Sequence, residues 1–182
     1  MPKRLFVAIR PPRTVLEELA GAVEPLHTEL PAPRWTRIES WHLTLAFLGA
    51  VDEPGPLMEQ LEQVAERHRP IRLHIGGAGH FDNRVLWAGV SGDHASLRRL
   101  AESVRAAARQ TGLKVEGKPY RGHITLARGV GDVDMRVLAD RLRGFTGSVW
   151  TATSLYLIES RLGAGPARSA QHQIYQRWPL RP

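Results

Sequence analysis

Apolar and polar positions alternate in two short stretches of the chain, and both stretches begin with the same residue types. Residues 42–49 read HLTLAFLG and residues 123–129 read HITLARG, so that histidine, an apolar residue, threonine, leucine and alanine recur in this order. Alternation of this kind is typical of a β-strand that buries one face. The pattern therefore predicts two strands that carry the same chemical groups.

The side chains of a strand point to its two faces in turn, and this decides what each predicted strand exposes. The histidine and the threonine of each motif share one face, so His42 lies with Thr44, and His123 lies with Thr125. The apolar residues expected on the opposite face are Leu43, Leu45 and Phe47 in the first motif and Ile124 and Leu126 in the second. Each strand can therefore bury its apolar face and present an imidazole and a hydroxyl on the other.

The rest of the chain changes between the two-residue period of strands and the longer period of helices. Strands are predicted over residues 5–9, 41–48, 71–81, 85–90, 123–129, 147–159 and 172–178. Helices are predicted over residues 14–26, 57–68, 96–111 and 134–143. Thr14 is expected to cap the first helix, and Asp82-Asn83 is a hairpin turn signal. The order β α β α β β α β α β β indicates an α+β fold with antiparallel sheets and a degenerate internal duplication.

The size of the chain limits how many domains it can form. With 182 residues, of which 42% are hydrophobic, it can bury a substantial core. This length fits one compact domain or two small lobes, and no linker is long enough to separate independent domains. Residues 1–182 are therefore expected to form a single two-lobed domain.

Composition excludes several classes of protein and site. The chain has no cysteine, which excludes disulfides, thiolate zinc sites and a cysteine nucleophile. The apolar run at residues 5–9 is too short for a secretory signal, and the longest uncharged apolar-rich stretch, residues 43–51, is too short to cross a bilayer. We therefore expect a soluble, cytoplasmic protein with no membrane partner.

The chain is basic, with a formal net charge of +7, and most of the excess positive charge is arginine. Lysine occurs only at positions 3, 114 and 118. Guanidinium groups bind phosphate oxygens in a bidentate fashion, so this surface is consistent with a nucleic acid or a phosphorylated ligand. An arginine-biased, GC-rich genome would produce the same excess, and composition alone does not separate the two explanations.

Two histidines and two hydroxyls on neighbouring strands suit acid–base chemistry on a phosphate. Hydrolysis of a phosphodiester needs a base for the attacking water and an acid for the leaving oxygen, and histidine can do either near neutral pH. Threonines and arginines can stabilise the equatorial oxygens of the transition state. A ribose 2′,3′-cyclic phosphate is a strained diester that suits such an attack, and the scheme needs no metal. The other histidines share no ligand spacing, so no metal site is predicted.

The motif pair resembles the signature of the 2H phosphoesterase superfamily, which is named for two His-x-Thr/Ser motifs. Within it, the chain resembles the bacterial and archaeal RNA 2′,3′-cyclic phosphodiesterases, also called the LigT-like or 2′-5′ RNA ligase family. The resemblance covers nearly the whole chain and includes residues 4–9 (RLFVAI), 41–49 (WHLTLAFLG), 119–121 (PYR) and 155–160 (LYLIES). Gly122 stands where the family usually has proline, which loosens the backbone before the second motif.

This resemblance implies two similar α+β lobes about a pseudo-twofold axis, each an antiparallel sheet with helices on its outer face. The groove between the lobes would carry both motifs. The implied activity is hydrolysis of RNA or nucleoside 2′,3′-cyclic phosphate ends to 2′-phosphates, with no metal or other cofactor. The implied site residues are Thr44 and Thr125, with His123 as the base on water and His42 as the acid on the O3′ leaving group.

Five further residues are candidates for binding the substrate. Arg128 resembles a family position that contacts phosphate, but its parity is opposite to that of the motif histidine, so it reaches the groove only if the strand ends or bulges there. Trp35 and Tyr120 could stack on a nucleobase, and Arg34 and Arg121 could contact backbone phosphates. For these four, core packing or an ordinary surface position is an equal alternative.

Two other functions stay open at this point. Some members of the family join tRNA halves through a 2′-5′ linkage, so RNA ligation is one alternative. A non-catalytic RNA-binding module is the other, although binding alone would not require a duplicated acid–base pair. In each case the expected partner is RNA or a cyclic nucleotide, and the protein is expected to be a monomer.

Overall fold

Two antiparallel sheets form the frame of the molecule, which the computed structural model describes over residues 1–181. The four-stranded sheet has the order β3 (Leu43–Val51), β1 (Lys3–Ile9), β8 (Ser154–Arg161), β9 (Gln171–Pro179). The five-stranded sheet has the order β2 (Arg34–Trp35), β6 (His123–Arg128), β5 (Val85–Gly92), β4 (Ile71–Phe81), β7 (Trp150–Ala152). Their paired strands run antiparallel, which confirms the predicted α+β fold with two antiparallel sheets.

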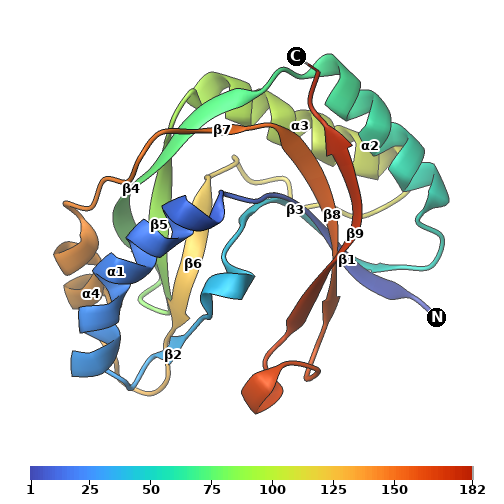
Figure 1. The fold of residues 1–182 in the computed structure, drawn as a ribbon. Helices are drawn as coiled ribbons and strands as arrows, with labels where there is room; N and C mark the ends of the chain where they lie inside the picture. Colours follow the sequence, from blue (N-terminus) through green and yellow to red (C-terminus); the bar gives the residue numbers. More distant parts are fainter. Residues whose placement is uncertain (182) are drawn as a thin grey trace.

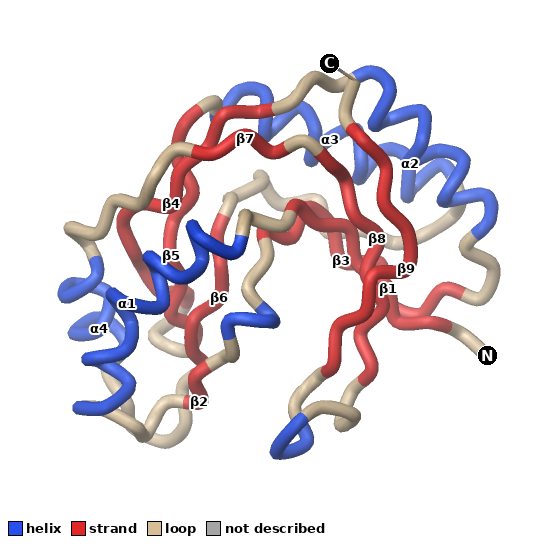
Figure 2. Tube along the Cα trace, viewed as in Figure 1, coloured by secondary structure: helices blue, strands red, loops and turns tan. Residues whose placement is uncertain are grey.

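The α-helices lie on the outer side of the two sheets. Helices α2 (Gly55–Arg67) and α3 (His94–Gln110) pack beside each other and against the four-stranded sheet, while α4 (Met135–Leu142) packs on β4 and β5, with α1 (Arg13–Glu29) next to it. Figures 1 and 2 show the sheets as an arch, with α2 and α3 outside it at the upper right, α4 at its left edge, and α1 in front of β4 and β5. We call the side of each sheet that faces away from the helices its inner face.

The duplication predicted from the two motifs is present in the topology, but its strands are exchanged between the sheets. Each sheet contains a strand–helix–strand unit that ends in a motif strand, β1-α1-β3 in one and β5-α3-β6 in the other. The helix after the first motif strand leads the chain into the opposite sheet, where β4 pairs with β5. The helix after the second motif strand leads first to β7 in the same sheet, and the chain then crosses to the opposite sheet, where β8 pairs with β1. The two sheets therefore depend on each other, because each is built from both halves of the chain.

One apolar core fills the space between helices and sheets, and a small second cluster lies apart from it. The main core draws buried residues from both sheets and all four α-helices. The second cluster consists of Phe6, Ala8 and Ile158, with Tyr156 packed against them, on the inner face of the four-stranded sheet. A buried apolar cluster on the helix-free face lowers the polarity around any side chain that contacts it.

Of three predicted local features, one strand and one helix cap are wrong, and one hairpin turn is confirmed. The strand predicted over residues 147–159 is wrong as one strand, because the chain changes sheet at Thr153, between β7 and β8. The alternating pattern continues through this junction, so it does not reveal the change. Thr14 does not cap the first helix, which begins at Arg13 after Pro12 and has no side-chain cap. The hairpin turn at Asp82-Asn83 is confirmed, and both residues adopt left-handed φ values of 50° and 55°.

Candidate active site

The first motif histidine lies at the start of β3, against the apolar cluster of the inner face. The His42 ring stacks on Phe6 with 4.6 Å between ring centres, and it meets the His172 ring edge-on at 5.0 Å. Leu43, the next residue, is fully buried on the core side. The alternation of β3 therefore fixes the imidazole on the face that the helices do not cover.

A β-bulge in the first motif strand changes which residues share this face. Val7 of β1 pairs with Ala46, whereas Ala8 pairs with Thr44, so Leu45 has no partner in the ladder. Leu45 and Ala46 are both buried, and Phe47 returns to the inner face, where its side chain is 65% exposed and its ring lies 6.0 Å from Phe6. The prediction that Phe47 lies on the buried face is therefore wrong, because the extra residue reverses the alternation.

The second motif strand has a bulge at the equivalent place. Trp87 of β5 pairs with Thr125 and Leu86 pairs with Ala127, which leaves Leu126 unpaired. Leu126 and Ala127 are both fully buried, so the next residue, Arg128, turns to the face that carries Thr125 and is exposed. This is the bulge on which the predicted position of Arg128 depended. Arg128 and Phe47 thus occupy equivalent places after the two motifs, one cationic and the other aromatic.

The second motif histidine is held by a backbone hydrogen bond. The Nδ1 atom of His123 lies 2.8 Å from the carbonyl oxygen of Arg121, and because a carbonyl only accepts, Nδ1 carries the proton. Phe81 meets the ring edge-on at 4.9 Å. The neutral imidazole therefore has its basic lone pair on Nε2, the atom that would act on a substrate.

Burial makes both motif histidines less basic than a free imidazole. Desolvation, followed by the charges of His172 and Arg10, lowers the pKa of His42 to about 3. Desolvation and the charge of Arg128 also lower the pKa of His123, against the opposing effect of the Arg121 carbonyl. Both imidazoles are therefore neutral at pH 7 in the unliganded protein.

Hydrogen bonds connect the two motif segments across the sheets. The Thr36 hydroxyl lies 2.8 Å and 2.9 Å from the carbonyl oxygens of Thr125 and Leu126, at the bulge of the second motif. The Trp41 indole donates to the same hydroxyl oxygen at 2.8 Å, immediately before the first motif. One threonine therefore connects the entry of one motif strand to the bulge of the other.

A second connection runs from the segment before β6 to β3. The Tyr120 hydroxyl donates to the Thr44 carbonyl at 3.0 Å, and the buried Arg105 guanidinium donates to the carbonyls of Leu45 at 3.4 Å and Lys118 at 2.7 Å. Arg105 also lies over the Tyr120 ring, at 5.4 Å from its centre. Tyr120, which we considered for stacking on a nucleobase, is therefore used inside the protein, since its hydroxyl and one ring face have protein partners.

The remaining candidates for binding the substrate, Arg34, Trp35 and Arg121, do not all lie on the face that carries the motif residues. In the register of β2 with β6, Arg34 is directly opposite Arg128, so both arginines lie on the inner face. Trp35 is opposite the buried Ala127, and its indole donates to the Leu30 carbonyl at 3.0 Å, so it lies on the core side and not with the motif residues. Arg121 is exposed, and its known contact to the site is through its backbone carbonyl.

His172 is the site neighbour that sequence reasoning missed. It lies on β9, and its ring contacts both His42 and Phe6, at 5.0 Å and 5.2 Å between ring centres. Its Nδ1 atom is buried and has no hydrogen-bond partner among the described residues. No spacing in the sequence relates His172 to either motif, because only the pairing of β9 with β8 and of β8 with β1 brings it there.

Replacing Thr36 with valine should destabilise the protein by about 1–3 kcal/mol, because the isosteric side chain removes the hydroxyl and leaves the Trp41 indole without its acceptor. Urea unfolding of both proteins measures this difference. Thr28→Val is the matched control, since within the described part of the chain the Thr28 hydroxyl bonds only to the Glu24 carbonyl, on an exposed helix turn. Equal destabilisation by the two substitutions would contradict the role given to Thr36.

Comparison with known proteins places these features in a family. The model of the 2′-5′ RNA ligase superfamily matches residues 11–164. The RNA 2′,3′-cyclic phosphodiesterase of Aeropyrum pernix is 32% identical over 123 residues, which is 64% of this chain and 68% of that protein. The enzyme of the same name from Geobacillus stearothermophilus is 37% identical over 108 residues, which is 56% of this chain but only 34% of that longer protein. The crystal structure of Escherichia coli LigT complexed with 3′-AMP has a TM-score of 0.74 and 25% identity, and the match covers 98% of each chain.

Proposed function

The chain belongs to the 2′-5′ RNA ligase superfamily, and from this membership and the site geometry we propose that it is an RNA 2′,3′-cyclic phosphodiesterase. In this proposal it hydrolyses 2′,3′-cyclic phosphate ends of RNA, or cyclic nucleotides, to 2′-phosphates. Relatives named RNA 2′,3′-cyclic phosphodiesterase support it, as does the nucleotide bound to a structural relative. One observation carries it: both motif strands bulge at the same place and hold a histidine and a threonine on the inner faces of the two sheets.

The reaction begins with the attack of water on phosphorus. We assign His123 as the base, because its Nδ1–H is bound to the Arg121 carbonyl and its Nε2 lone pair can take the water proton. The same carbonyl favours the imidazolium that forms, since it accepts a hydrogen bond from the positive ring. The new bond joins the water oxygen to phosphorus opposite the O3′ leaving group.

The reaction ends when the bond from phosphorus to O3′ breaks. His42 supplies the proton that O3′ needs, so that the product is a 2′-phosphate with a free 3′-hydroxyl. His42 is neutral in the unliganded protein, because its pKa is about 3. The anionic cyclic phosphate favours the protonated ring once it is bound, so His42 takes up a proton from solvent as the substrate binds.

The phosphate oxygens gain charge in the transition state, and the inner face has donors for them. Thr44 and Thr125 share a face with their motif histidines, and Arg128 follows the second bulge onto that face. A positive guanidinium and two hydroxyls would stabilise the equatorial oxygens. Arg34, directly opposite Arg128 in the ladder, adds a second positive charge at the same edge.

The exposed Phe47 ring gives the site an apolar side. The Phe47 ring lies beside Phe6, on the same sheet as His42. In the second motif, the residue at the equivalent position after the bulge is Arg128. A nucleobase stacks well on such a ring, and a phosphate does not. The nucleoside would therefore lie toward Phe47, and the free phosphate oxygens toward Arg128.

The proposal is tested by incubating the protein with adenosine 2′,3′-cyclic phosphate and identifying the product by ³¹P NMR. We expect adenosine 2′-phosphate, and we expect the rate to be unchanged by EDTA, because the mechanism uses only side chains. If the protein does not turn over this substrate, the proposed activity is wrong, and a non-catalytic RNA-binding module becomes the better interpretation. Inhibition by EDTA that zinc or manganese reverses would contradict the metal-free scheme.

The dependence of kcat/KM on pH should be bell-shaped and centred on the acid side of pH 6.5. Burial lowers the pKa of both histidines in the free enzyme, and kcat/KM reports free-enzyme ionisations. Above the upper pKa of the pair, kcat/KM should fall about tenfold per pH unit as the acid loses its proton. Initial rates between pH 4 and pH 9 measure the profile, and a maximum above pH 7 would contradict the burial of the pair.

Ligation is a second candidate, which the name of the matching family model favours. It differs from hydrolysis only in the nucleophile, because a 5′-hydroxyl of RNA would replace water. Adding an RNA with a 5′-hydroxyl end to the assay distinguishes the two reactions by the appearance of a longer product. We propose hydrolysis as the main activity and a monomer as the active form. In the part of the chain that is described, no helix combines the length and the apolar character that crossing a membrane requires.

A further inference from the structure

A second group of basic residues lies beside the first motif, outside the residues assigned to the reaction. Arg10 directly follows β1, and Arg177 belongs to β9. Their guanidinium carbons lie 5.7 Å and 5.8 Å from the centre of the same Tyr156 ring. Two positive groups therefore gather around one aromatic side chain.

These two guanidiniums have no negative partner of their own. Among residues 1–181, no carboxylate lies within ion-pair distance of either one. The Ser154 hydroxyl accepts a hydrogen bond from Nε of Arg177 at 3.0 Å, which holds the base of this guanidinium and leaves its outer nitrogens to other partners. Two positive charges beside one ring repel each other, and an anion bound between them would offset the repulsion.

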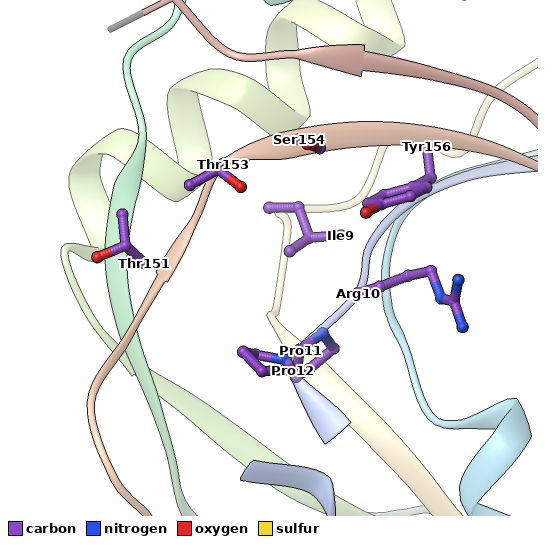
Figure 3. A pocket seen from close by; sticks show the side chains of 8 residues that line it. All are labelled: Ile9, Arg10, Pro11, Pro12, Thr151, Thr153, Ser154 and Tyr156. Atoms are coloured by element: carbon purple, nitrogen blue, oxygen red, sulfur yellow. The ribbon is translucent and has the colours of Figure 1, made fainter. Parts of the chain in front are cut away.

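A cavity of about 340 Å³ is lined by Arg10 and by the two residues that Arg177 contacts, Tyr156 and Ser154. Its lining consists of Ile9, Arg10, Pro11, Pro12, Thr151, Thr153, Ser154 and Tyr156. Figure 3 shows the Tyr156 and Thr153 hydroxyls directed toward the space between them, with the Arg10 side chain extending beside the Tyr156 ring. The cavity therefore combines hydroxyl donors with positive charge, which suits a phosphate and its ribose.

The sheet register relates this cavity to the proposed reaction. Ala8 of β1 pairs with Thr44 on one side and with Tyr156 on the other, so the three side chains share the inner face. Thr44 and Tyr156 are thus two strand spacings apart, about 10 Å. The charge of Arg10 reaches His42, where it lowers the pKa of the imidazole. One phosphate at the motifs cannot also occupy the Tyr156 cavity at this separation, but the next phosphate of an RNA chain can.

We propose that Arg10, Arg177 and Tyr156 bind the phosphodiester that precedes the cyclic phosphate end of an RNA substrate. This inference rests on the proposed function and adds to it, because it makes an oligonucleotide a better ligand than a mononucleotide. The guanidiniums pair with the non-bridging oxygens of that phosphodiester, and the threonine and tyrosine hydroxyls contact the adjoining ribose.

Binding of two reaction products tests this subsite without depending on turnover. Isothermal titration calorimetry would measure Kd for adenosine 2′-phosphate and for the dinucleotide ApA with a terminal 2′-phosphate. We expect the dinucleotide to bind about tenfold more tightly, which corresponds to about 1.4 kcal/mol. Its Kd should also depend more steeply on salt, by about 0.7 in the log–log slope for one added phosphate.

The double variant Arg10→Gln/Arg177→Gln should reduce the ratio of the two Kd values to about one. The matched control is Arg69→Gln/Arg98→Gln, which removes the same charge from exposed positions outside the cavity and should keep the tenfold ratio. Thermal unfolding checks that each variant is folded, and Arg177→Gln alone serves if the double variant is not. A wild-type ratio of one, or a ratio that the variant leaves unchanged, would overturn the subsite.

The proposed function and the subsite fail in different ways. If the protein binds the dinucleotide more tightly but hydrolyses neither adenosine 2′,3′-cyclic phosphate nor ApA with a terminal 2′,3′-cyclic phosphate, the proposed activity is wrong and the subsite stands. If it hydrolyses adenosine 2′,3′-cyclic phosphate but binds both products equally, the activity stands and the subsite is wrong. Equal weakening of both products by the double variant would also overturn the subsite, because it would assign the arginines to the phosphate at the motifs.

Discussion

Replacing either motif histidine with glutamine should lower kcat/KM for adenosine 2′,3′-cyclic phosphate by about 10²–10⁴-fold, the usual effect of a lost acid or base. The reason is that His42 and His123 each move one proton in the proposed reaction and no neighbouring group is assigned to replace them. Initial rates by chromatography measure the effect. The control is His94→Gln, because His94 is exposed at the start of α3 and has no role in the proposed reaction, and this variant should keep wild-type turnover.

A substrate with a better leaving group separates the roles of the two histidines. A nitrophenolate leaves without being protonated, so a 3′-deoxynucleoside 2′-(4-nitrophenyl phosphate), in which nitrophenolate takes the place of the O3′ leaving group, does not need the acid. If His42 is the acid, His42→Gln should recover most of its activity on this substrate, and His123→Gln should not. Recovery by His123→Gln instead would reverse the two roles and leave the proposed activity standing. Wild-type turnover by either variant on the cyclic phosphate would contradict the two-histidine mechanism.

The second large effect is a loss of stability in acid that depends on His42. Its pKa in the folded protein is about 3, whereas an unfolded chain titrates near 6.5. Between these values the unfolded chain holds a proton that the folded protein lacks, so the free energy of unfolding falls as pH decreases through this window. Its contribution is complete above pH 6.5 and falls by up to about 1.4 kcal/mol per pH unit toward pH 3.

Urea unfolding at pH 7, 6, 5 and 4 measures this effect by comparing the wild type with His42→Gln. We expect the difference in unfolding free energy between the two proteins to change steadily below pH 6.5, because the variant lacks the titrating group. His123 and His172 also have lowered pKa values and contribute with the same sign. Because the His172 ring contacts His42, the comparison is repeated in a His172→Gln background, which separates the titration of His42 from that of its neighbour. A difference that is constant with pH would mean that His42 titrates normally in the folded state.

The residues at the equivalent positions after the two bulges make the two ends of the site chemically different. An exact duplication would place the same residue type at both, but Phe47 follows the first bulge and Arg128 follows the second. In a site whose histidines and threonines are repeated, these two side chains differ most in chemistry. They therefore provide a physical reason for the two histidines to have separate roles, since a nucleotide would bind with its base and its phosphate at opposite ends.

Local periodicity along the chain was enough to predict the motif strands and the side chains that they expose. Alternation defined both motif strands and placed His42 with Thr44 and His123 with Thr125, because the direction of a side chain in a strand follows from its position alone. The order of the four α-helices, most of the strand order and the Asp82-Asn83 turn could be predicted for the same reason, but the two-residue strand β2 was missed. The functional family also followed from the sequence, since the repeated motif is local.

Only the tertiary structure decided the features that depend on pairing between distant strands. The two bulges moved Phe47 and Arg128 to the inner face, and a bulge exists only relative to a partner strand. The change of sheet at Thr153 divides one predicted strand into β7 and β8. Alternation of apolar and polar residues could not predict this, because it does not show which strand a segment pairs with. His172 and Arg177 came beside residues of β1 and β8 because β9 closes the four-stranded sheet, a contact between the two ends of the chain that no short motif encodes.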